Sequence, residues 1–315
     1  MNLIHPSAII EPGAVIGLGS CVGAFSHIKP GARIGQECSL GNGVYVEDDV
    51  VIGNHVILGN GVQIGKGTLI EDDVSIKARA IITSAPLSKS SLPLNSYQTT
   101  IKAGTRVEYN STILAGVTLG RNSQVEPGSV VKRTVPANAI VAGNPAGIVG
   151  YAASAIPKVG FSLPGLADDK QSPLLLEVGG CALYRLPLIT DIRGQLAVTE
   201  FGKDLPFQPK RCFWVFDVPN REVRGEHAHK ELHQFLICVK GSASVVLDDG
   251  KNRMELNLSQ PNVGLHIPPR VWGIQYKYSP DAILLVLTSD IYLSEDYIRD
   301  YDDFLAFTKQ STTPV

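Results

Sequence analysis

The first half of the chain repeats a hydrophobic position every six residues. Fourteen consecutive positions of this frame hold an aliphatic residue: Ile4, Ile10, Ile16, Val22, Ile28, Ile34, Leu40, Val46, Ile52, Leu58, Ile64, Ile70, Ile76 and Ile82. An α-helix repeats every 3.6 residues and a single strand every two, so neither explains the pattern. A short strand followed by a tight turn does explain it. Three such sides per coil predict a parallel β-helix with the aliphatic residues inside.

One segment, from Thr83 to Gln98, interrupts this frame. Its sequence, TSAPLSKSSLPLNSYQ, has more proline and polar residues than a coil can use, so we expect an excursion loop. Binding residues concentrate on loops that a rigid scaffold carries. The frame then resumes at Ile101, Val107, Ile113, Leu119, Val125 and Val131, and it closes with VPANAIVAGNPAGIVG.

Short alternating segments fill the second half: CALYRLPLI, RCFWVFDV, HQFLICVKG, SASVVLDDG, VGLHIPP and AILLVLTS. Asp249-Gly250 indicates a hairpin, and DYIRDYDDFLAF indicates a short helix. Many short strands separated by turns predict a closed barrel or a jelly roll. We therefore expect an all-β protein with a β-helix in residues 1–157, a linker in 158–172 and a barrel in 173–315.

Composition and charge argue against several classes of protein, namely nucleic-acid-binding, membrane and secreted proteins. A chain of 315 residues suits two domains, and a net charge of −2 provides no global field that attracts nucleic acid or anionic lipid. No apolar run approaches the roughly 18 residues of a membrane helix, and the region near Met1 lacks a signal-peptide pattern. Five cysteines are scattered without CxxC spacing. We expect reduced thiols in a cytoplasmic protein.

The stretch RGEHAHKELHQ holds the candidate chemistry of the second half. Metal-binding cupins, a jelly-roll family, use a His-x-His pair, a following Glu and a later His. Here Gln234 and Gly273 stand where that Glu and that His would fall, so we predict no metal site. Alternation along a strand puts His227 and His229 on one face, where bare imidazoles suit proton transfer near neutral pH. Two surface histidines on an edge strand stay open as the alternative.

Three segments of the first half carry a resemblance: GNGVQIGKGTLIEDDVSI, TILAGVTLG and VPANAIVAGNPAG. With the repeat, they resemble the left-handed β-helix acyltransferases, in particular the N-acetyltransferases of nucleotide-linked amino sugars. The resemblance covers about residues 1–150 and implies a homotrimer with acetyl-CoA in the groove between neighbouring prisms. It implies contacts of acetyl-CoA with Ala115, Gly116, Lys132, Arg133, Asn144 and Pro145.

That chemistry is attack of a neutral amine on a thioester, which a base assists. Candidate bases in register with the coils are Asn60, Glu71, Asp72, His27 and His55. With 18 residues per coil, His55 and Asp73 fall on the same corner of successive coils. Two alternatives stay open: these residues are solvated corners, or the thioester sulfur or a water takes the proton.

Several ordered blocks of residues 173–307, among them VRGEHAHKELHQFLICVKGS and LLVLTSDIYLSEDYIRDYDDF, resemble the dTDP-sugar 3,4-ketoisomerases. The resemblance implies a cupin-like barrel that converts dTDP-4-keto-6-deoxyglucose to a dTDP-3-keto-6-deoxyhexose. It implies base and shuttle roles for His227 and His229, and support of the diphosphate or enediolate by Arg224. Arg193 is expected to influence which face of C4 is protonated. Relatives carry Tyr-Tyr where this chain has Phe213-Trp214, so Tyr276 is the substitute candidate.

Together the two resemblances imply a bifunctional enzyme, which also N-acetylates the derived dTDP-3-amino sugar for a surface polysaccharide such as the lipopolysaccharide O-antigen. The segment Asp191–Gly194 favours the galactose series. Two rival hypotheses stay open. One is another acyl acceptor or donor. The other is a non-catalytic protein, in which the β-helix is a scaffold and the barrel a dTDP-sugar sensor.

Overall fold

The structure is a computed structural model that describes residues 1–83, 98–152, 173–219 and 222–310. The chain forms two compact units, Met1–Ala152 and Ala153–Val315. The expected linker 158–172 lies outside the described residues, as does the expected excursion loop except for its end residues Thr83 and Gln98. Each unit is described by itself.

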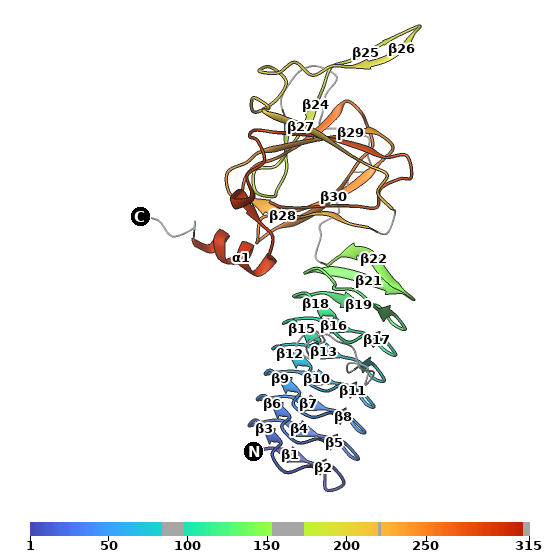
Figure 1. The fold of residues 1–315 in the computed structure, drawn as a ribbon, viewed down its shortest axis with the longest axis vertical. Helices are drawn as coiled ribbons and strands as arrows, with labels where there is room; N and C mark the ends of the chain where they lie inside the picture. The colour runs from blue at the N-terminus through green and yellow to red at the C-terminus, as the bar shows by residue number, and fades with distance from the viewer. Residues whose placement is uncertain (84–97, 153–172, 220–221, 311–315) are drawn as a thin grey trace, which may run out of the picture. The chain divides into compact units, whose positions relative to one another are not determined.

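The first unit is a parallel β-helix built from two-residue strands, which confirms the interpretation of the repeat (Figure 1). Each strand pairs with the strand one coil away, so that Leu3 lies opposite Cys21. One sheet contains β1 (Leu3–Ile4), β4 (Cys21–Val22), β7 (Ser39–Leu40), β10 (Ile57–Leu58), β13 (Ser75–Ile76), β16 (Arg106–Val107), β19 (Gln124–Val125), β21 (Ala139–Gly143) and β22 (Ala146–Tyr151). The antiparallel pair of β21 and β22 closes the coil stack.

The other two sides of the prism are sheets of the same kind. The second sheet contains β2 (Ile9–Ile10), β5 (His27–Ile28), β8 (Tyr45–Val46), β11 (Gln63–Ile64), β14 (Ile81–Ile82), β17 (Thr112–Ile113) and β20 (Val130–Val131). The third contains β3 (Val15–Ile16), β6 (Arg33–Ile34), β9 (Val51–Ile52), β12 (Leu69–Ile70), β15 (Thr100–Ile101) and β18 (Thr118–Leu119). Leu69 pairs with Thr100, so the coil register continues across the excursion.

The aliphatic frame fills the prism interior. Its members from Val22 to Val131 are buried, whereas Ile4 in the first coil is 43% exposed because no coil covers it on one side. The coils approach so closely at their corners that a Cβ on Gly35 would lie 2.3 Å from the carbonyl oxygen of Gly53. Only glycine fits such a contact, which explains why it follows the aliphatic residue so often.

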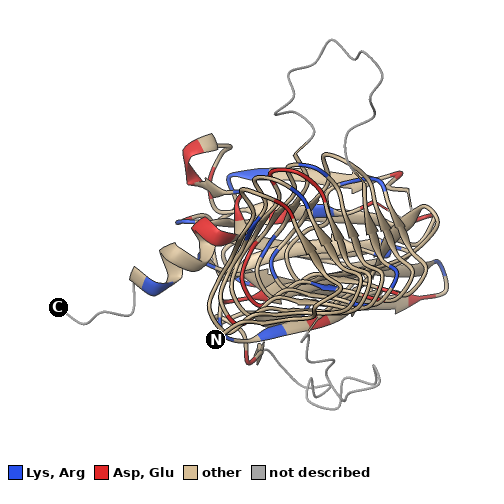
Figure 2. Ribbon diagram, turned by 90° about the horizontal axis from the view of Figure 1, so that it is seen from below, with Lys and Arg blue, Asp and Glu red and all other residues tan. Residues whose placement is uncertain are grey.

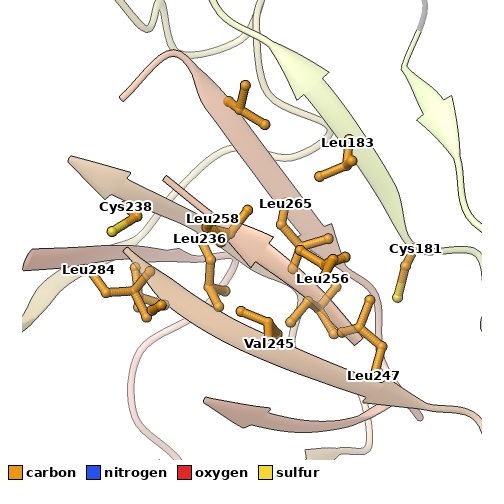
Figure 3. Close-up of a cluster of buried hydrophobic side chains, with 14 of the residues drawn as sticks. Cys181, Leu183, Leu236, Cys238, Val245, Leu247, Leu256, Leu258, Leu265 and Leu284 are labelled. Carbon is orange, nitrogen blue, oxygen red and sulfur yellow. The ribbon is translucent and has the colours of Figure 1, made fainter. Parts of the chain in front are cut away.

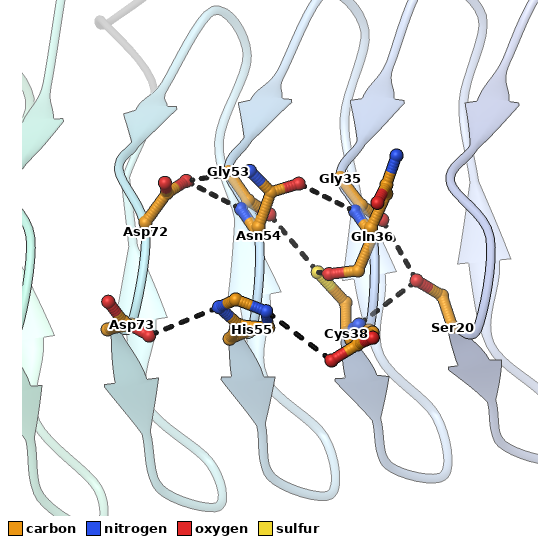
Figure 4. Close-up of polar contacts among 10 residues, drawn as sticks. Ser20, Gly35, Gln36, Cys38, Gly53, Asn54, His55, Asp72 and Asp73 are labelled. Atoms are coloured by element: carbon orange, nitrogen blue, oxygen red, sulfur yellow. Dashed lines mark hydrogen bonds and ion pairs between the residues drawn. The ribbon is translucent and has the colours of Figure 1, made fainter.

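Polar side chains tie successive corners together (Figure 4). The backbone N–H of Asn54 donates to the Asp72 carboxylate of the next coil at 2.7 Å. His55 lies between two carboxylates, with Nε2 3.4 Å from Glu37 and Nδ1 3.3 Å from Asp73. The prediction that His55 and Asp73 share a corner is therefore confirmed.

The second unit is a cupin-like barrel made from two sheets. The six-stranded sheet contains β23 (Leu174–Leu175), β24 (Ala182–Arg185), β32 (Val263–Ile267), β29 (Gln234–Lys240), β34 (Ile283–Thr288) and β27 (Arg211–Phe216). The five-stranded sheet contains β31 (Arg253–Leu258), β30 (Ala243–Asp248), β33 (Trp272–Tyr276), β28 (Arg224–His229) and β35 (Tyr297–Ile298). Aliphatic side chains of both sheets meet between them, as Figure 3 shows for Leu236, Val245 and Leu265.

Two further elements complete this unit. A separate hairpin of β25 (Leu188–Asp191) and β26 (Gly194–Ala197) is exposed along its whole length. The chain then forms a short 3-10 helix, η2 (Ser294–Asp296), and the helix α1 (Tyr301–Gln310), close to where the sequence predicts one. The Tyr301 hydroxyl donates to Asp248 at 2.6 Å and fastens α1 to the end of β30.

Both basic and acidic residues are distributed over the coils of the β-helix (Figure 2). Within the described ranges, no helix combines the length and apolar character that crossing a membrane requires.

The interior frame generates a stability prediction. Ile64 is fully buried, and its neighbour Gln63 on β11 is exposed. We expect Ile64→Ala to lower the free energy of unfolding of the β-helix by roughly 2–5 kcal/mol, because it removes apolar contacts and leaves a cavity. Gln63→Ala, the matched control, should change it by less than about 0.5 kcal/mol. Urea unfolding followed by circular dichroism measures both changes. Equal losses of unfolding free energy in the two variants would contradict a stabilising role for the buried frame residue.

Candidate active site

The His-x-His motif lies on β28, in the five-stranded sheet. A bulge interrupts the pairing of β28 with β33 between Gly225 and His227. Gly225 has φ 84°, and a Cβ there would lie 2.6 Å from the carbonyl oxygen of Gly273. Glycine is therefore required at this point, and the bulge sets the direction in which the following side chains leave the strand.

The two imidazoles face each other, as the alternation along the strand predicts. Nε2 of His227 lies 3.2 Å from Nε2 of His229, and the ring planes are nearly perpendicular at 88°. His227 Nδ1 lies 2.9 Å from the carbonyl oxygen of Gly225. A carbonyl oxygen only accepts hydrogen bonds, so this Nδ1 carries a proton and the Nε2 of a neutral His227 carries a lone pair.

Asp296 fixes the second imidazole in the same tautomer. Its carboxylate accepts a hydrogen bond from Nδ1 of His229 at 2.7 Å, and both side chains are almost completely buried. The other carboxylate oxygen accepts from the backbone N–H of Glu231 at 2.9 Å, which holds Asp296 in place. With both Nδ1 atoms protonated, both Nε2 atoms are unprotonated and lie 3.2 Å apart, and the Nε2 of His229 accepts a hydrogen bond from the Gln234 amide. The pair is thus built to take up one proton and share it.

The surroundings of the pair do not fit a metal ion. Gln234 donates its amide N–H to Nε2 of His229 at 3.1 Å, and Gly273 lies opposite His227 in the strand register. An amide nitrogen and a glycine supply no ligands of the kind a cupin metal uses. Within the described parts of the chain, no three His, Cys, Asp or Glu residues are grouped so that they could hold an ion.

Burial sets the protonation of the pair. It lowers the pKa of His227, and it lowers the pKa of His229 to about 4 although Asp296 acts in the opposite direction. The positive charge of Arg299 lowers both values further. Both imidazoles are therefore neutral at pH 7 and available as a base.

Tyr297 and Gln275 also line this region. The Tyr297 ring lies 4.9 Å from the His227 ring and 4.4 Å from the His229 ring, between centroids. Gln275 is buried, and its register partner on β28 is Arg224. The exposed Arg224 therefore starts the same strand face as the histidines and lies toward one end of the barrel.

Other residues expected from the sequence are not brought to the pair. Arg193 lies at the tip of the β25–β26 hairpin, where its guanidinium pairs with Asp191 at 2.6 Å. Tyr276 follows Gln275 on β33 and so points to the opposite face of the sheet, where it interacts with Glu255. His233 instead contacts His266, with Nδ1 2.9 Å from Nε2 of His266.

In the β-helix, the carboxylate and amide candidates for a base fasten the coils. Asn60 accepts from the N–H of Asn42 at 2.9 Å, and Asp72 accepts from Asn54. Glu71 accepts from the N–H of Ala103 at 2.9 Å. These oxygens have a structural role, which register alone did not reveal. His27 differs, because its Nε2 lies 2.5 Å from a Glu11 carboxylate oxygen in a dyad on the outside of a sheet.

The residues expected to contact acetyl-CoA occupy the end of the β-helix that follows the excursion. The N–H groups of Ala115 and Gly116 donate to the hydroxyls of Thr83 and Thr99, which flank the excursion. The other expected contact residues are exposed: Lys132 and Arg133 follow β20, and Asn144 and Pro145 form the turn between β21 and β22.

Three site residues were not singled out from the sequence: Asp296, Tyr297 and Arg299. They lie in SEDYIRDY, where Asp296 ends η2, Tyr297 begins β35 and Arg299 follows β35, and the pairing of β35 with β28 brings this segment beside the histidines. His229 and Asp296 are 67 residues apart. No local spacing rule predicts a contact over that separation, which depends on how the barrel closes.

Three family descriptions match the chain. "WxcM-like, C-terminal" matches residues 179–309, which include the whole histidine site. "Bacterial transferase hexapeptide (six repeats)" matches residues 31–66, and "Hexapeptide repeat of succinyl-transferase" matches residues 8–48 and 109–133.

Two proteins of Aneurinibacillus thermoaerophilus are similar to separate halves of the chain. TDP-4-oxo-6-deoxy-alpha-D-glucose-3,4-oxoisomerase is 47% identical over 116 residues, which are 37% of this chain and 84% of that protein. dTDP-3-amino-3,6-dideoxy-alpha-D-galactopyranose 3-N-acetyltransferase is 41% identical over 64 residues, which are 20% of this chain and 33% of that protein. The chain thus spans about a third of the second relative.

Solved structures are similar to the barrel. The 3,4-ketoisomerase from Helicobacter canadensis has 41% identity and a TM-score of 0.40, over 41% of this chain and 97% of that chain. The TDP-quinovose 3,4-ketoisomerase from Campylobacter jejuni has 42% identity and a TM-score of 0.40, over 41% of this chain and 99% of that chain.

Fold and sequence relatives together define an enzyme in which a hexapeptide-repeat transferase unit precedes a cupin-like isomerase unit. Through its second half, the chain belongs to the WxcM-like family.

The lowered pKa values of the pair generate a pH prediction. A reaction that uses the pair as its base should keep its kcat/KM constant from pH 8 to pH 6.5 and lose it only as the pH falls further, because the imidazoles are protonated below the ordinary histidine pKa. The unfolded chain binds these protons more easily, so the folded state also loses stability below pH 6.5. Circular dichroism at each pH separates the two effects. An acid limb centred above pH 7 would contradict the account.

Proposed function

We propose that the barrel converts dTDP-4-keto-6-deoxyglucose to a dTDP-3-keto-6-deoxyhexose. One observation carries this proposal: two neutral imidazoles face each other through Nε2, and Gly225 and Asp296 hold both Nδ1 protons. The reaction needs a site that removes a proton from C3 and delivers one to C4. A pair that takes up one proton and shares it between two nitrogens meets that need. The 47% identity to a TDP-sugar 3,4-oxoisomerase supports the same substrate class.

The steps follow from the geometry of the pair. One Nε2 lone pair removes the C3 proton, and the electrons of that bond form a C3–C4 double bond as the C4 carbonyl becomes an anionic oxygen. The hydroxyl proton at O3 moves to O4. The C3 carbonyl then forms, and the double-bond electrons take the proton from the imidazole at C4. No atom is gained or lost, and the second imidazole lets the proton shift between the two carbons.

For the first half, we propose N-acetylation of the derived dTDP-3-amino-3,6-dideoxyhexose with acetyl-CoA. The hexapeptide repeats and the 41% identity to a sugar 3-N-acetyltransferase support this activity. The finer parts of the proposal are the galactose series, acetyl-CoA contacts at the residues after the excursion, and a homotrimer. Five free cysteines are typical of a reducing compartment and support a cytoplasmic location.

The isomerase proposal predicts the behaviour of two variants. We expect His227→Asn and His229→Asn to slow exchange of the C3 hydrogen with D2O by roughly 10²–10⁴-fold, because each removes a nitrogen that carries the transferred proton. NMR of the 4-keto sugar in D2O measures this exchange directly. A sugar-nucleotide sensor would bind the same molecule without exchanging it.

Acetylation supplies the internal control for these variants. The two activities depend on residues of different compact units, so N-acetylation of the 3-amino sugar should change less than about twofold. Addition of EDTA should leave the isomerisation of the wild-type protein unchanged. Near-normal exchange in both variants would refute the role of the pair, and a loss that only a divalent metal restores would refute its metal-free chemistry.

The acetyltransferase proposal predicts a charge effect. We expect Lys132→Glu to raise the KM for acetyl-CoA by roughly tenfold with little change in kcat, because an exposed cation near the CoA phosphates is replaced by an anion. Arg33→Glu reverses the charge of another exposed residue, on β6 and several coils away, and is the matched control. Steady-state kinetics with varied acetyl-CoA compares the two. A KM that is unchanged in Lys132→Glu would remove this residue from the CoA site.

A further inference from the structure

We propose that Arg299 is a further catalytic residue of the barrel, and that its guanidinium binds the two oxygens that carry the negative charge of the enediolate. This inference rests on the isomerisation proposed above. It concerns a residue that stands outside the His-x-His motif and that the sequence alone did not single out.

Strand pairing places Arg299 beside the histidines. On β28 and β35, His229 lies opposite Tyr297, and Ala228 lies opposite Ile298. Arg299 directly follows β35, and continued alternation puts its side chain on the same side as that of Tyr297, two residues earlier. The Arg299 guanidinium carbon lies 4.3 Å from the centre of the Tyr297 ring. That ring in turn contacts both imidazoles, so it connects the guanidinium to the pair.

The guanidinium is held in place but not neutralised. A cation over an aromatic face is positioned by the ring without a partner for its N–H groups. Among the described residues, no carboxylate or carbonyl accepts a hydrogen bond from the Arg299 side chain. Arg299 is also exposed. All five N–H donors are therefore available to a ligand that enters the site.

The reaction generates a ligand of the matching shape. When the C3 proton leaves, its bonding electrons form the C3–C4 double bond, and the carbonyl π electrons move onto O4 as a negative charge. After the O3 proton moves to O4, the charge lies on O3. The two oxygens are on neighbouring carbons in one plane. A planar guanidinium presents two parallel N–H groups, and this fork suits a pair of oxygens better than a point charge does.

Arg224, the guanidinium suggested by the motif, is not among the charges that shift the pKa of either imidazole. Arg224 begins β28, and its charge acts on Tyr278. Burial raises the pKa of Tyr278, and the positive charge of Arg224 acts in the opposite direction. The charge of Arg299, by contrast, reaches both imidazoles, where it adds to the effect of burial in lowering the pKa. The charge of Arg299 thus acts on the pair, and the charge of Arg224 acts on Tyr278.

The test compares Arg299→Met and Arg299→Lys with the wild-type protein, using dTDP-4-keto-6-deoxyglucose as substrate. We expect Arg299→Met to lower kcat by roughly 10²–10³-fold with KM nearly unchanged, the usual effect of removing a donor to a transition-state oxyanion. Arg299→Lys, which keeps the charge and loses the fork, should lie between the two. In Arg299→Met the acid limb of kcat/KM should also move to higher pH, since a cation that lowers both imidazole pKa values is gone.

A matched control is Arg270→Met. Arg270 is also exposed and also lies over an aromatic ring, with its guanidinium carbon 5.3 Å from the centre of the Phe307 ring, and we expect its loss to leave kcat and KM unchanged. A raised KM with normal kcat in Arg299→Met would assign Arg299 to the diphosphate and overturn the inference, as would unchanged kinetics. A wild-type protein that does not isomerise the sugar would instead overturn the proposed function and this inference with it.

Discussion

The site depends on the hydrogen bond from Nδ1 of His229 to the Asp296 carboxylate, 2.7 Å long and almost completely buried. It fixes the tautomer of His229, and the Gly225 carbonyl does the same for His227. Only then are the two Nε2 atoms, which lie 3.2 Å apart, both unprotonated. The bulge in β28, the β35 pairing and the Gln234 amide all serve this arrangement, because each orients one member of the pair.

The two units are stabilised in different ways, the β-helix by a repeated local unit and the barrel by pairing between segments far apart in the sequence. The β-helix repeats one short unit, so its interior is a stack of aliphatic side chains, and corner residues such as Asp72 accept hydrogen bonds from backbone N–H groups of the preceding coil. The barrel brings distant segments together and can bury polar groups beside one another, as it does with His229 and Asp296. An isolated buried histidine favours its neutral form, and that same burial makes the pair a base at neutral pH.

The sequence predicted the architecture well because periodicity reports directly on burial. The six-residue frame follows the prism interior, and strict alternation put His227 and His229 on one face. Residue type and register say less about chemistry. Glu71 and Asn60 suit a base by type, and in the structure an oxygen of each accepts a backbone N–H group, so the base of the first half stays a prediction. The roles of Asp296 and Arg299 could not be predicted from the sequence, because strand pairing across the barrel, rather than local spacing, brings their segment beside the histidines.

The central claim is that the histidine pair holds no proton between its Nε2 atoms at rest and shares one when it acts as a base. Nitrogen-15 NMR of histidine-labelled protein, assigned with the two His→Asn variants, tests it most directly. At pH 7 we predict protonated Nδ1 and bare Nε2 in both residues, with both Nε2 signals moving together as one proton binds at lower pH. A proton on either Nε2 at pH 7, or two independent titrations, would contradict the account.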